Sequence, residues 1–89
     1  MDRLEGAWKV RRESGLLPPF GIHKRIKGDR GWTMLGPIPI APFKVEGTRL
    51  RYTFLPLEDE LDLLDDGTFV GRGYVLGKKF CRFRMEAEH

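Results

Sequence analysis

Hydrophobic and polar residues alternate one by one in several short stretches of this sequence. Trp8 and Val10 share one face of an extended chain while basic residues take the other, and near the far end Cys81 and Phe83 alternate with arginines. Alternation with a period of two is typical of β-strands that are buried on one side. No stretch of ten or more residues without Gly or Pro keeps an apolar period of 3.6, and a weak helical pattern in 58–64 alternates equally well. The pattern therefore predicts an all-β chain.

Glycine and proline divide these stretches from one another. The 11 Gly and 6 Pro are spread along the whole chain, which is typical of short strands joined by tight turns. Asp66-Gly67 is among the strongest short hairpin signals, while three prolines within 37–42 predict an extended segment that cannot lie centrally in a sheet. The predicted strands are 6–12, 20–26, 32–35, 43–45, 50–54, 60–64, 68–76 and 80–85.

Seven or eight short strands in 89 residues leave room for a single domain, spanning residues 1–89. An open antiparallel meander of this length exposes two unpaired edges and one apolar face. Closing the sheet into a barrel covers the face and removes both edges. We therefore predict one small antiparallel up-and-down β-barrel.

The stretch Leu4-Glu5-Gly6-Ala7-Trp8-Lys9-Val10 resembles the opening of the lipocalins and the wider calycin barrels. In those families a Gly-x-Trp motif begins the first strand, the Trp closes one end of the barrel, and an Arg of the last strand packs across its indole. The resemblance implies that Gly6 and Trp8 take the places of that motif in a calycin-like barrel. It also implies that Arg84, or alternatively Arg82, packs on Trp8, a contact that gains about 0.5–2 kcal/mol.

The resemblance further implies a function for the barrel interior. An eight-stranded barrel is just wide enough to be filled by side chains or to hold one small ligand, so we expect a small apolar or amphipathic ligand. Two arginines, Arg49 and Arg51, are candidates to hold an anionic head group of that ligand at the rim. The aromatic residues expected to line the end opposite Trp8 are Phe20, Trp32, Phe43, Tyr52 and Phe54.

Two other functions are compatible with a small β-barrel. The many bulky rings can also fill the barrel, and the apolar segments 16–20 and 38–43 then form a surface for a homodimer. Alternatively, basic grooves with exposed aromatic residues bind single-stranded nucleic acid, although the six acids in 58–66 oppose this. The residues available for nucleic acid are Arg25, Lys27, Arg30, Trp32, Arg49, Arg51 and Tyr52.

The charged residues are gathered in runs. Residues 23–30 are mainly basic, residues 58–66 hold six acids and no base, and the net charge is +3. We interpret both runs as solvent-facing parts of edge strands and turns, where charge blocks aggregation. The basic run is also a candidate contact for phosphates or for an acidic partner.

Nothing in the sequence supports an enzymatic activity. His23, Cys81 and His89 do not have the spacing of metal ligands, so we expect neither a metal nor a cofactor, and we interpret Cys81 as an inert buried thiol. One cysteine excludes an internal disulfide, and with no export signal it favours the reducing cytoplasm. The apolar runs are only a few residues long, too short to span a bilayer, and we expect no membrane partner.

Overall fold

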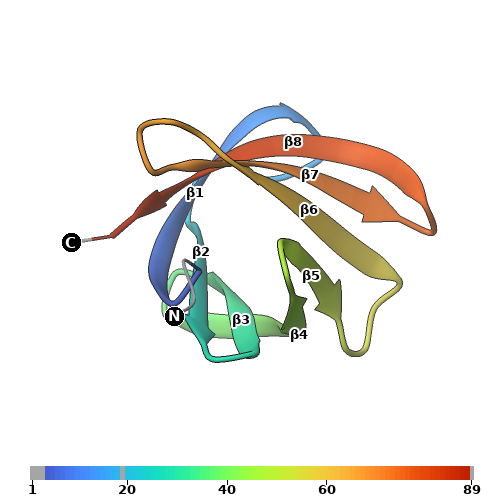
Figure 1. Cartoon of the computed structure of the whole chain (residues 1–89). Helices are drawn as coiled ribbons and strands as arrows, with labels where there is room; N and C mark the ends of the chain where they lie inside the picture. The colour runs from blue at the N-terminus through green and yellow to red at the C-terminus, as the bar shows by residue number, and fades with distance from the viewer. Residues whose placement is uncertain (1–3, 19, 89) are drawn as a thin grey trace.

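The chain folds into a closed antiparallel barrel of eight strands, which follow one another around the barrel in chain order (Figure 1). The computed structural model describes residues 4–18 and 20–88, and none of these residues lies in a helix. Both the all-β class and the up-and-down barrel are therefore confirmed. The strands are β1 (Gly6–Gly15), β2 (Ile22–Lys27), β3 (Arg30–Leu35), β4 (Ile38–Glu46), β5 (Arg49–Tyr52), β6 (Leu57–Leu63), β7 (Phe69–Val75) and β8 (Lys78–Ala87).

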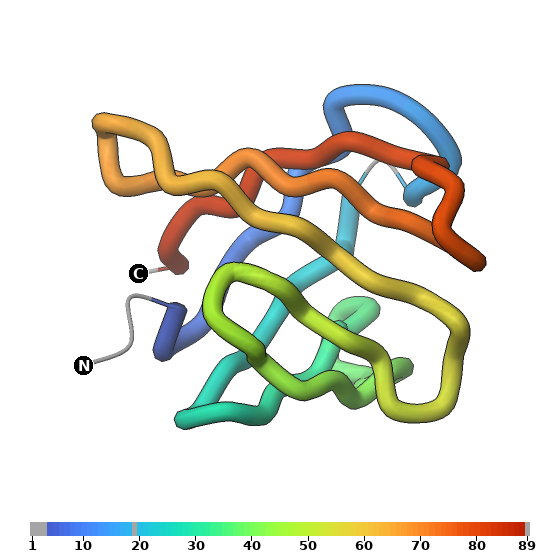
Figure 2. The backbone as a smooth tube through the Cα atoms, turned by 45° about the vertical axis from the view of Figure 1, so that its right-hand side comes forward, coloured from blue at the N-terminus to red at the C-terminus, as the bar shows by residue number. Residues whose placement is uncertain are grey.

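Pairing between the first and last strands closes the barrel, and Figure 2 shows these two strands, in blue and red, coming together. β1 and β8 run antiparallel from Trp8 opposite Ala87 to Gly15 opposite Cys81. A register shift just after Arg12 marks a bulge, which bends a strand and helps a short sheet to curl. Every strand therefore has two neighbours, and the interpretation of the charged runs as protection of edge strands is wrong.

Alternate residues of the strands point into the barrel, as the sequence pattern predicts. Trp8 and Val10 of β1 are buried, and so are Cys81 and Phe83 of β8, while the residues between them are more exposed. The buried hydrophobic core consists of Leu4, Trp8, Val10, Ile22, Ile26, Phe43, Leu50, Leu61, Phe69, Cys81, Phe83 and Met85.

Most of the proline-rich segment lies in the first half of β4, which pairs with β3; towards β5 its Pro42 carbonyl accepts a hydrogen bond from Thr53 N–H at 3.1 Å, just beyond the end of β5. Residues 38–42 face β3, with Pro42 opposite Trp32, whereas the pairing of β4 with β5 begins at Phe43. A proline cannot donate to a neighbouring strand and is tolerated where one side of its strand is free. The expectation of an extended but not central segment is therefore confirmed.

The up-and-down topology gives the barrel two different ends. We call one the open end; it carries the β1–β2, β3–β4, β5–β6 and β7–β8 connections, and most of its loops lie towards the right in Figure 2. The opposite end, the closed end, carries the other three connections. Two predicted strands reach too far towards the open end, because Phe20 and Phe54 lie in its loops, where each is 79% exposed.

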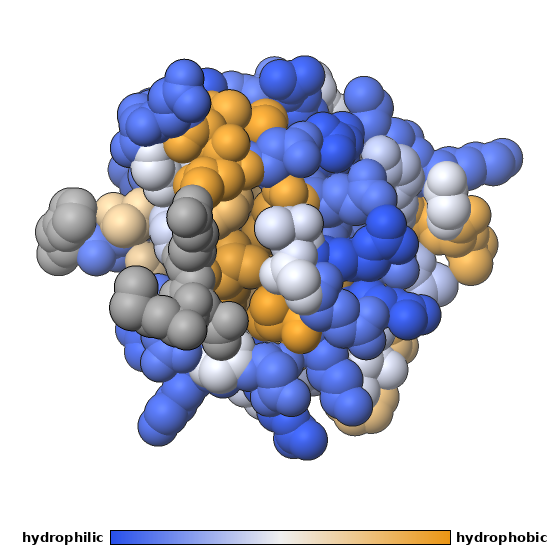
Figure 3. Space-filling model, viewed as in Figure 1, coloured by the Kyte–Doolittle hydropathy of each residue, from blue (hydrophilic) through white to orange (hydrophobic). Residues whose placement is uncertain are grey.

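The outer wall of the barrel is mainly hydrophilic. In the view of Figure 3, polar and charged residues cover most of the surface, and an apolar strip runs from top to bottom to the left of its centre. An apolar projection stands out at the right-hand edge, where β7 turns into β8. In this view the exposed apolar residues therefore lie mainly in the strip and the projection, and hydrophilic residues cover most of the remaining surface.

Candidate functional site

A cluster of polar side chains is buried inside the barrel. Lys24 of β2 donates from Nζ to Thr33 Oγ1 at 2.7 Å and to the Tyr52 hydroxyl at 2.6 Å, and Nζ lies 3.1 Å from Asp59 Oδ2. The Tyr52 hydroxyl donates in turn to Asp59 Oδ2 over 3.1 Å. Lys24 is only 3% exposed and Asp59 only 4%. We call these four residues, from β2, β3, β5 and β6, the polar cluster.

Strand geometry explains why the two charged residues of the cluster point inward. Lys24 lies between Ile22 and Ile26 on the inward face of β2, and Asp59 lies two residues before the buried Leu61 on β6. Residues two apart on a strand share a face, so each charge takes a position that its strand assigns to the core. The sequence reasoning missed both residues, although their spacing from the buried hydrophobic residues is a signal that could have found them.

The polar cluster keeps Lys24 in its charged form. Burial alone would lower the pKa of Lys24, but the attraction of the Asp59 carboxylate and of the Tyr52 hydroxyl outweighs it and raises the pKa above its ordinary value. The rings of Phe43, Tyr52 and Phe83 also lie 5.3, 5.3 and 5.7 Å from Nζ, within the range of cation–π attraction. Because a nucleophilic amine must be neutral, Lys24 is suited to structure and electrostatics rather than to covalent chemistry.

A cavity of about 250 Å³ lies next to the polar cluster and towards the open end. All four members of the cluster line it, together with mostly apolar side chains, so the side chains do not fill this half of the barrel. Both cluster contacts of Asp59 use Oδ2, and Oδ1 accepts no hydrogen bond from the described residues. The apolar residues of the wall include Val10, Ile22, Ala41, Leu57, Phe80 and Phe83.

Trp8 is buried in the core near the closed end, as expected, but Arg84 does not pack on its indole. Its indole N–H donates to a backbone carbonyl just before β1 at 2.8 Å, and its ring meets that of Phe69 edge to face, with centroids 5.4 Å apart. Gly6 begins β1 with a φ of 122°, which glycine adopts readily. Arg84 alternates with the inward residues of β8 and lies 3.7 Å from a carboxylate oxygen of Glu13. The expected packing of Arg84 across the indole is therefore wrong.

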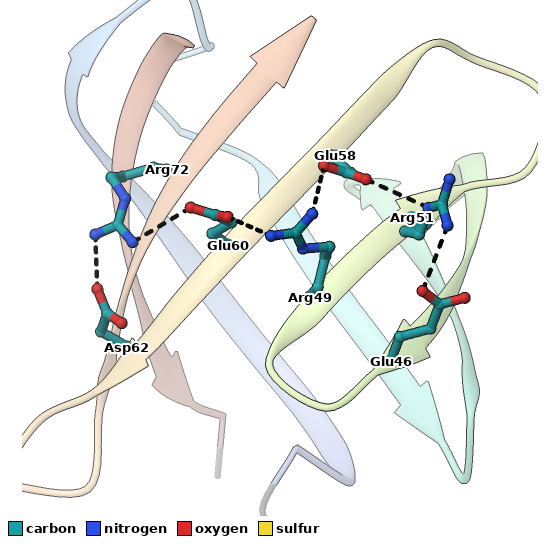
Figure 4. A network of polar contacts seen from close by, with 7 residues as sticks. All are labelled: Glu46, Arg49, Arg51, Glu58, Glu60, Asp62 and Arg72. Atoms are coloured by element: carbon teal, nitrogen blue, oxygen red, sulfur yellow. Dashed lines mark hydrogen bonds and ion pairs between the residues drawn. The ribbon is translucent and has the colours of Figure 1, made fainter. Parts of the chain in front are cut away.

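The acidic run pairs with arginines on the outer wall of β5, β6 and β7 (Figure 4). Arg49 lies 3.2 Å from Glu58 and 2.6 Å from Glu60. Arg51 lies 3.3 Å from Glu58 and 3.6 Å from a glutamate of β4, and an arginine of β7 continues the row. These exposed pairs neutralise one another, and neither Arg49 nor Arg51, the two residues expected to hold a head group, lines the cavity.

The aromatic residues expected at the open end fall into three groups. Tyr52 lines the cavity as part of the polar cluster, and Phe43 is a core residue whose ring lies 5.5 Å from that of Tyr52. Trp32 lies on the outer wall and is 47% exposed. Phe20 and Phe54 are in the loops of the open end. Of the residues expected to bind nucleic acid, Tyr52 is inside the barrel, and Arg49 and Arg51 are paired with glutamates. The other four line one hollow on the outer wall, namely Arg25, Lys27, Arg30 and Trp32.

Within the residues that the structure describes, no three His, Cys, Asp or Glu side chains come together as a metal site would require. Burial raises the pKa of the Cys81 thiol, which keeps the sulfur protonated and unreactive. What the site offers is apolar wall area and a small number of buried hydrogen-bonding groups.

No protein-family model and no curated protein matches this chain. The resemblance to calycins therefore consists of the Gly-x-Trp opening and a closed barrel of eight antiparallel strands. A barrel of this kind hosts many functions, so the fold alone assigns none.

Proposed function

We propose that this barrel binds one small, mainly apolar molecule in the cavity at its open end. The observation that carries the proposal is an apolar cavity of about 250 Å³ that ends on the polar cluster, of which Lys24, Thr33 and Asp59 are buried and Tyr52 is half-buried. Small-molecule sites are concave and mostly apolar, with a few polar groups that fix the orientation of the ligand. Because such sites usually measure about 300–1,000 Å³, this cavity suits a ligand at the small end of the range.

The polar cluster favours a ligand with a neutral hydroxyl group over one with an anionic group. The N–H groups of Lys24 are directed at Thr33, Tyr52 and Asp59, and its charge is balanced by Asp59. An anion that took Lys24 for itself would leave the Asp59 carboxylate buried without its partner, which is costly. A hydroxyl group, in contrast, can donate to Asp59 Oδ1. The proposed ligand class is therefore an alcohol with a short apolar chain.

A titration followed by NMR tests this assignment. We expect octan-1-ol to shift the backbone amide signals of Thr33 and Cys81 saturably and to give nuclear Overhauser contacts with the methyl groups of Ile22 and Leu57. Octanoate should bind at least about tenfold more weakly, which corresponds to about 1.4 kcal/mol. The tryptophans are poor reporters, because neither lines the cavity.

Two variants with the same substitution separate binding in the cavity from binding elsewhere. Ala41→Phe places a ring in the cavity and should abolish the shifts, whereas Ala7→Phe adds the same ring outside the cavity and should leave them unchanged. The spectrum of each variant reports whether the barrel is intact. Absence of saturable shifts with both octan-1-ol and octanoate contradicts the proposal, and stronger binding of octanoate contradicts the choice of ligand class.

A further inference from the structure

The exposed large hydrophobic residues of this protein gather at one place. Among residues 4–18 and 20–88, ten such residues are exposed, and all but Trp32 and Leu63 lie at the open end, in its loops or in the adjoining ends of β3 and β4. Phe20 and Phe54 are 79% exposed, and Leu76, in the turn that projects in Figure 3, is equally exposed. Isolated apolar residues on a surface are ordinary, but a contiguous group marks a site of interaction. The eight residues of this apolar rim are Leu16, Phe20, Leu35, Ile38, Ile40, Phe54, Leu55 and Leu76.

The charges of the open end are of one sign. Its segments 14–23, 34–42, 52–57 and 74–81 contain no Asp or Glu. Lys78 and Lys79 are exposed there, and within the described part of the chain neither forms an ion pair. Glu13 and Glu58, the acidic residues that directly flank two of these segments, form ion pairs with arginines. The apolar rim is thus bordered by free cations without an acid of its own.

Several backbone N–H and C=O groups of the rim loops are already hydrogen-bonded within the protein. Hydrogen bonds join its loops to one another and to the barrel: Leu16 N–H donates to Phe80 O at 2.9 Å, and Leu76 N–H donates to Pro56 O at 3.0 Å. Gly36 N–H donates across the end to another loop at 2.8 Å. Backbone groups that are already paired lose less when a loop enters an apolar phase.

We propose that the open end docks on the surface of an anionic lipid bilayer, with the apolar rim in the interface and the lysines against the head groups. Interfacial binding of this kind combines apolar side chains at the depth of the head groups with cations attracted to anionic lipids. It needs no spanning segment, and the described residues include no helix that could cross a membrane. The expectation of no membrane partner, which came from the lack of such a segment, is revised by this proposal.

The positive charge of Lys78 and Lys79 favours an anionic bilayer over a second copy of the chain as the surface that covers the rim. Two copies docked rim to rim would bring the lysines of both towards an interface that contains no acid to pair with them. Like charges brought together in this way oppose association. An anionic bilayer supplies the missing counter-charge. Leu35, Ile40 and Leu55 of the rim also line the cavity, but Phe20, Phe54 and the two lysines do not. Variants of these four residues therefore test the docking separately from the cavity ligand.

Vesicle flotation of the whole chain tests the docking. Vesicles of phosphatidylcholine with about 30% phosphatidylglycerol, an anionic lipid, should carry the protein upward in the density gradient. Binding to vesicles of pure phosphatidylcholine should be at least tenfold weaker. The double variant Phe20→Ser/Phe54→Ser and the double variant Lys78→Glu/Lys79→Glu should each lose at least tenfold. The matched control Trp32→Ser/Leu63→Ser changes two exposed apolar residues that lie outside the rim and should bind like the parent.

Each result decides the matter. Equal loss in the control and rim variants, or no flotation with either lipid, overturns the proposal. A concentration-dependent dimer in analytical ultracentrifugation that the Phe20→Ser/Phe54→Ser variant abolishes, without flotation of the parent, assigns the rim to a second copy instead. Ala41→Phe should still float, so that failure of the cavity proposal and failure of the docking proposal remain distinguishable.

Discussion

Lys24 occupies a position that its strand otherwise gives to hydrophobic residues. Its ammonium group is held by three oxygen atoms and three aromatic rings, and its counter-charge comes from Asp59 on a strand far along the chain. Burying such a pair gains little compared with a pair of apolar residues, but removing one partner strands the other in a medium of low dielectric. At the residue scale, the stability of the barrel interior therefore depends on both charges being present together.

Replacing one charge should cost much more than replacing both. Lys24→Met leaves Asp59 buried and unpaired and should lower the free energy of unfolding by about 3–5 kcal/mol, as measured by urea unfolding at pH 7. The double variant Lys24→Met/Asp59→Leu should recover most of that loss, since it removes both charges. A double variant less stable than Lys24→Met would contradict this account of the pair.

Alkaline pH should weaken the parent protein through the same residue. The pKa of Lys24 is raised by folding, so its contribution is complete below the ordinary value of 10.5 and is lost as the pH rises from there through the value in the folded state. The free energy of unfolding should therefore fall above about pH 10.5, and more steeply in the parent than in Lys24→Met/Asp59→Leu. Equal slopes would show that Lys24 is not the group responsible.

At the scale of strands, close packing of β3 against β4 depends on Gly31. Gly31 lies opposite Phe43, and a Cβ added to Gly31 would lie 2.5 Å from the carbonyl oxygen of Arg25 and 2.6 Å from the Phe43 ring. A carbonyl oxygen in a sheet cannot move aside without breaking the strand pairing. The same ring stands 5.3 Å from the Lys24 ammonium, so the packing here also positions the floor of the cavity.

Gly31→Ala should therefore destabilise the barrel by about 3 kcal/mol through overpacking. The comparison variant Gly36→Ala lies in a turn with open space around it and a φ of 57°, so it bears only the backbone cost, about 1–2 kcal/mol. Thermal unfolding measures both. A cost for Gly31→Ala no greater than that for Gly36→Ala would contradict the close approach of Phe43.

Strand positions were predictable from the sequence because alternation and turn residues are local signals. The ends of strands were less so: Phe54 continues the alternation of Leu50 and Tyr52, but pairing stops at Tyr52 and the chain leaves the barrel. The polar cluster was missed because Lys24 and Asp59 lie within runs of charge, where composition conceals their inward phase. The partner of Lys24, Asp59, lies on β6, and the closed barrel brings these two strands face to face. No local pattern in the sequence specifies that arrangement.

At the scale of the whole molecule, the two halves of the barrel interior differ. Towards the closed end, the buried rings of Trp8 and Phe69 pack edge to face, with centroids 5.4 Å apart. The packed half therefore provides much of the hydrophobic stabilisation of this small domain. The half with the cavity holds the polar cluster, and it is the half in which we propose that the ligand lies.

The two tryptophans should differ strongly when each is replaced by alanine. Trp8→Ala should cost about 3–5 kcal/mol, a large fraction of the stability of a domain of this size, because Trp8 is buried in the core. Trp32→Ala, on the outer wall, should cost less than about 1 kcal/mol. Urea unfolding followed by far-ultraviolet circular dichroism compares them, and equal costs would show that Trp8 does not hold the packed half together.

The pairing of β1 with β8 also has a consequence for biosynthesis. The ribosome makes Trp8 79 residues before its partner Ala87, so at about 5–20 residues per second the nascent β1 waits about 4–16 s for it. During translation the emerging sheet has two unpaired edges, one on β1 and one on the newest strand, and either edge can pair with a strand of a neighbouring nascent chain. Release of β8 from the exit tunnel removes both at once.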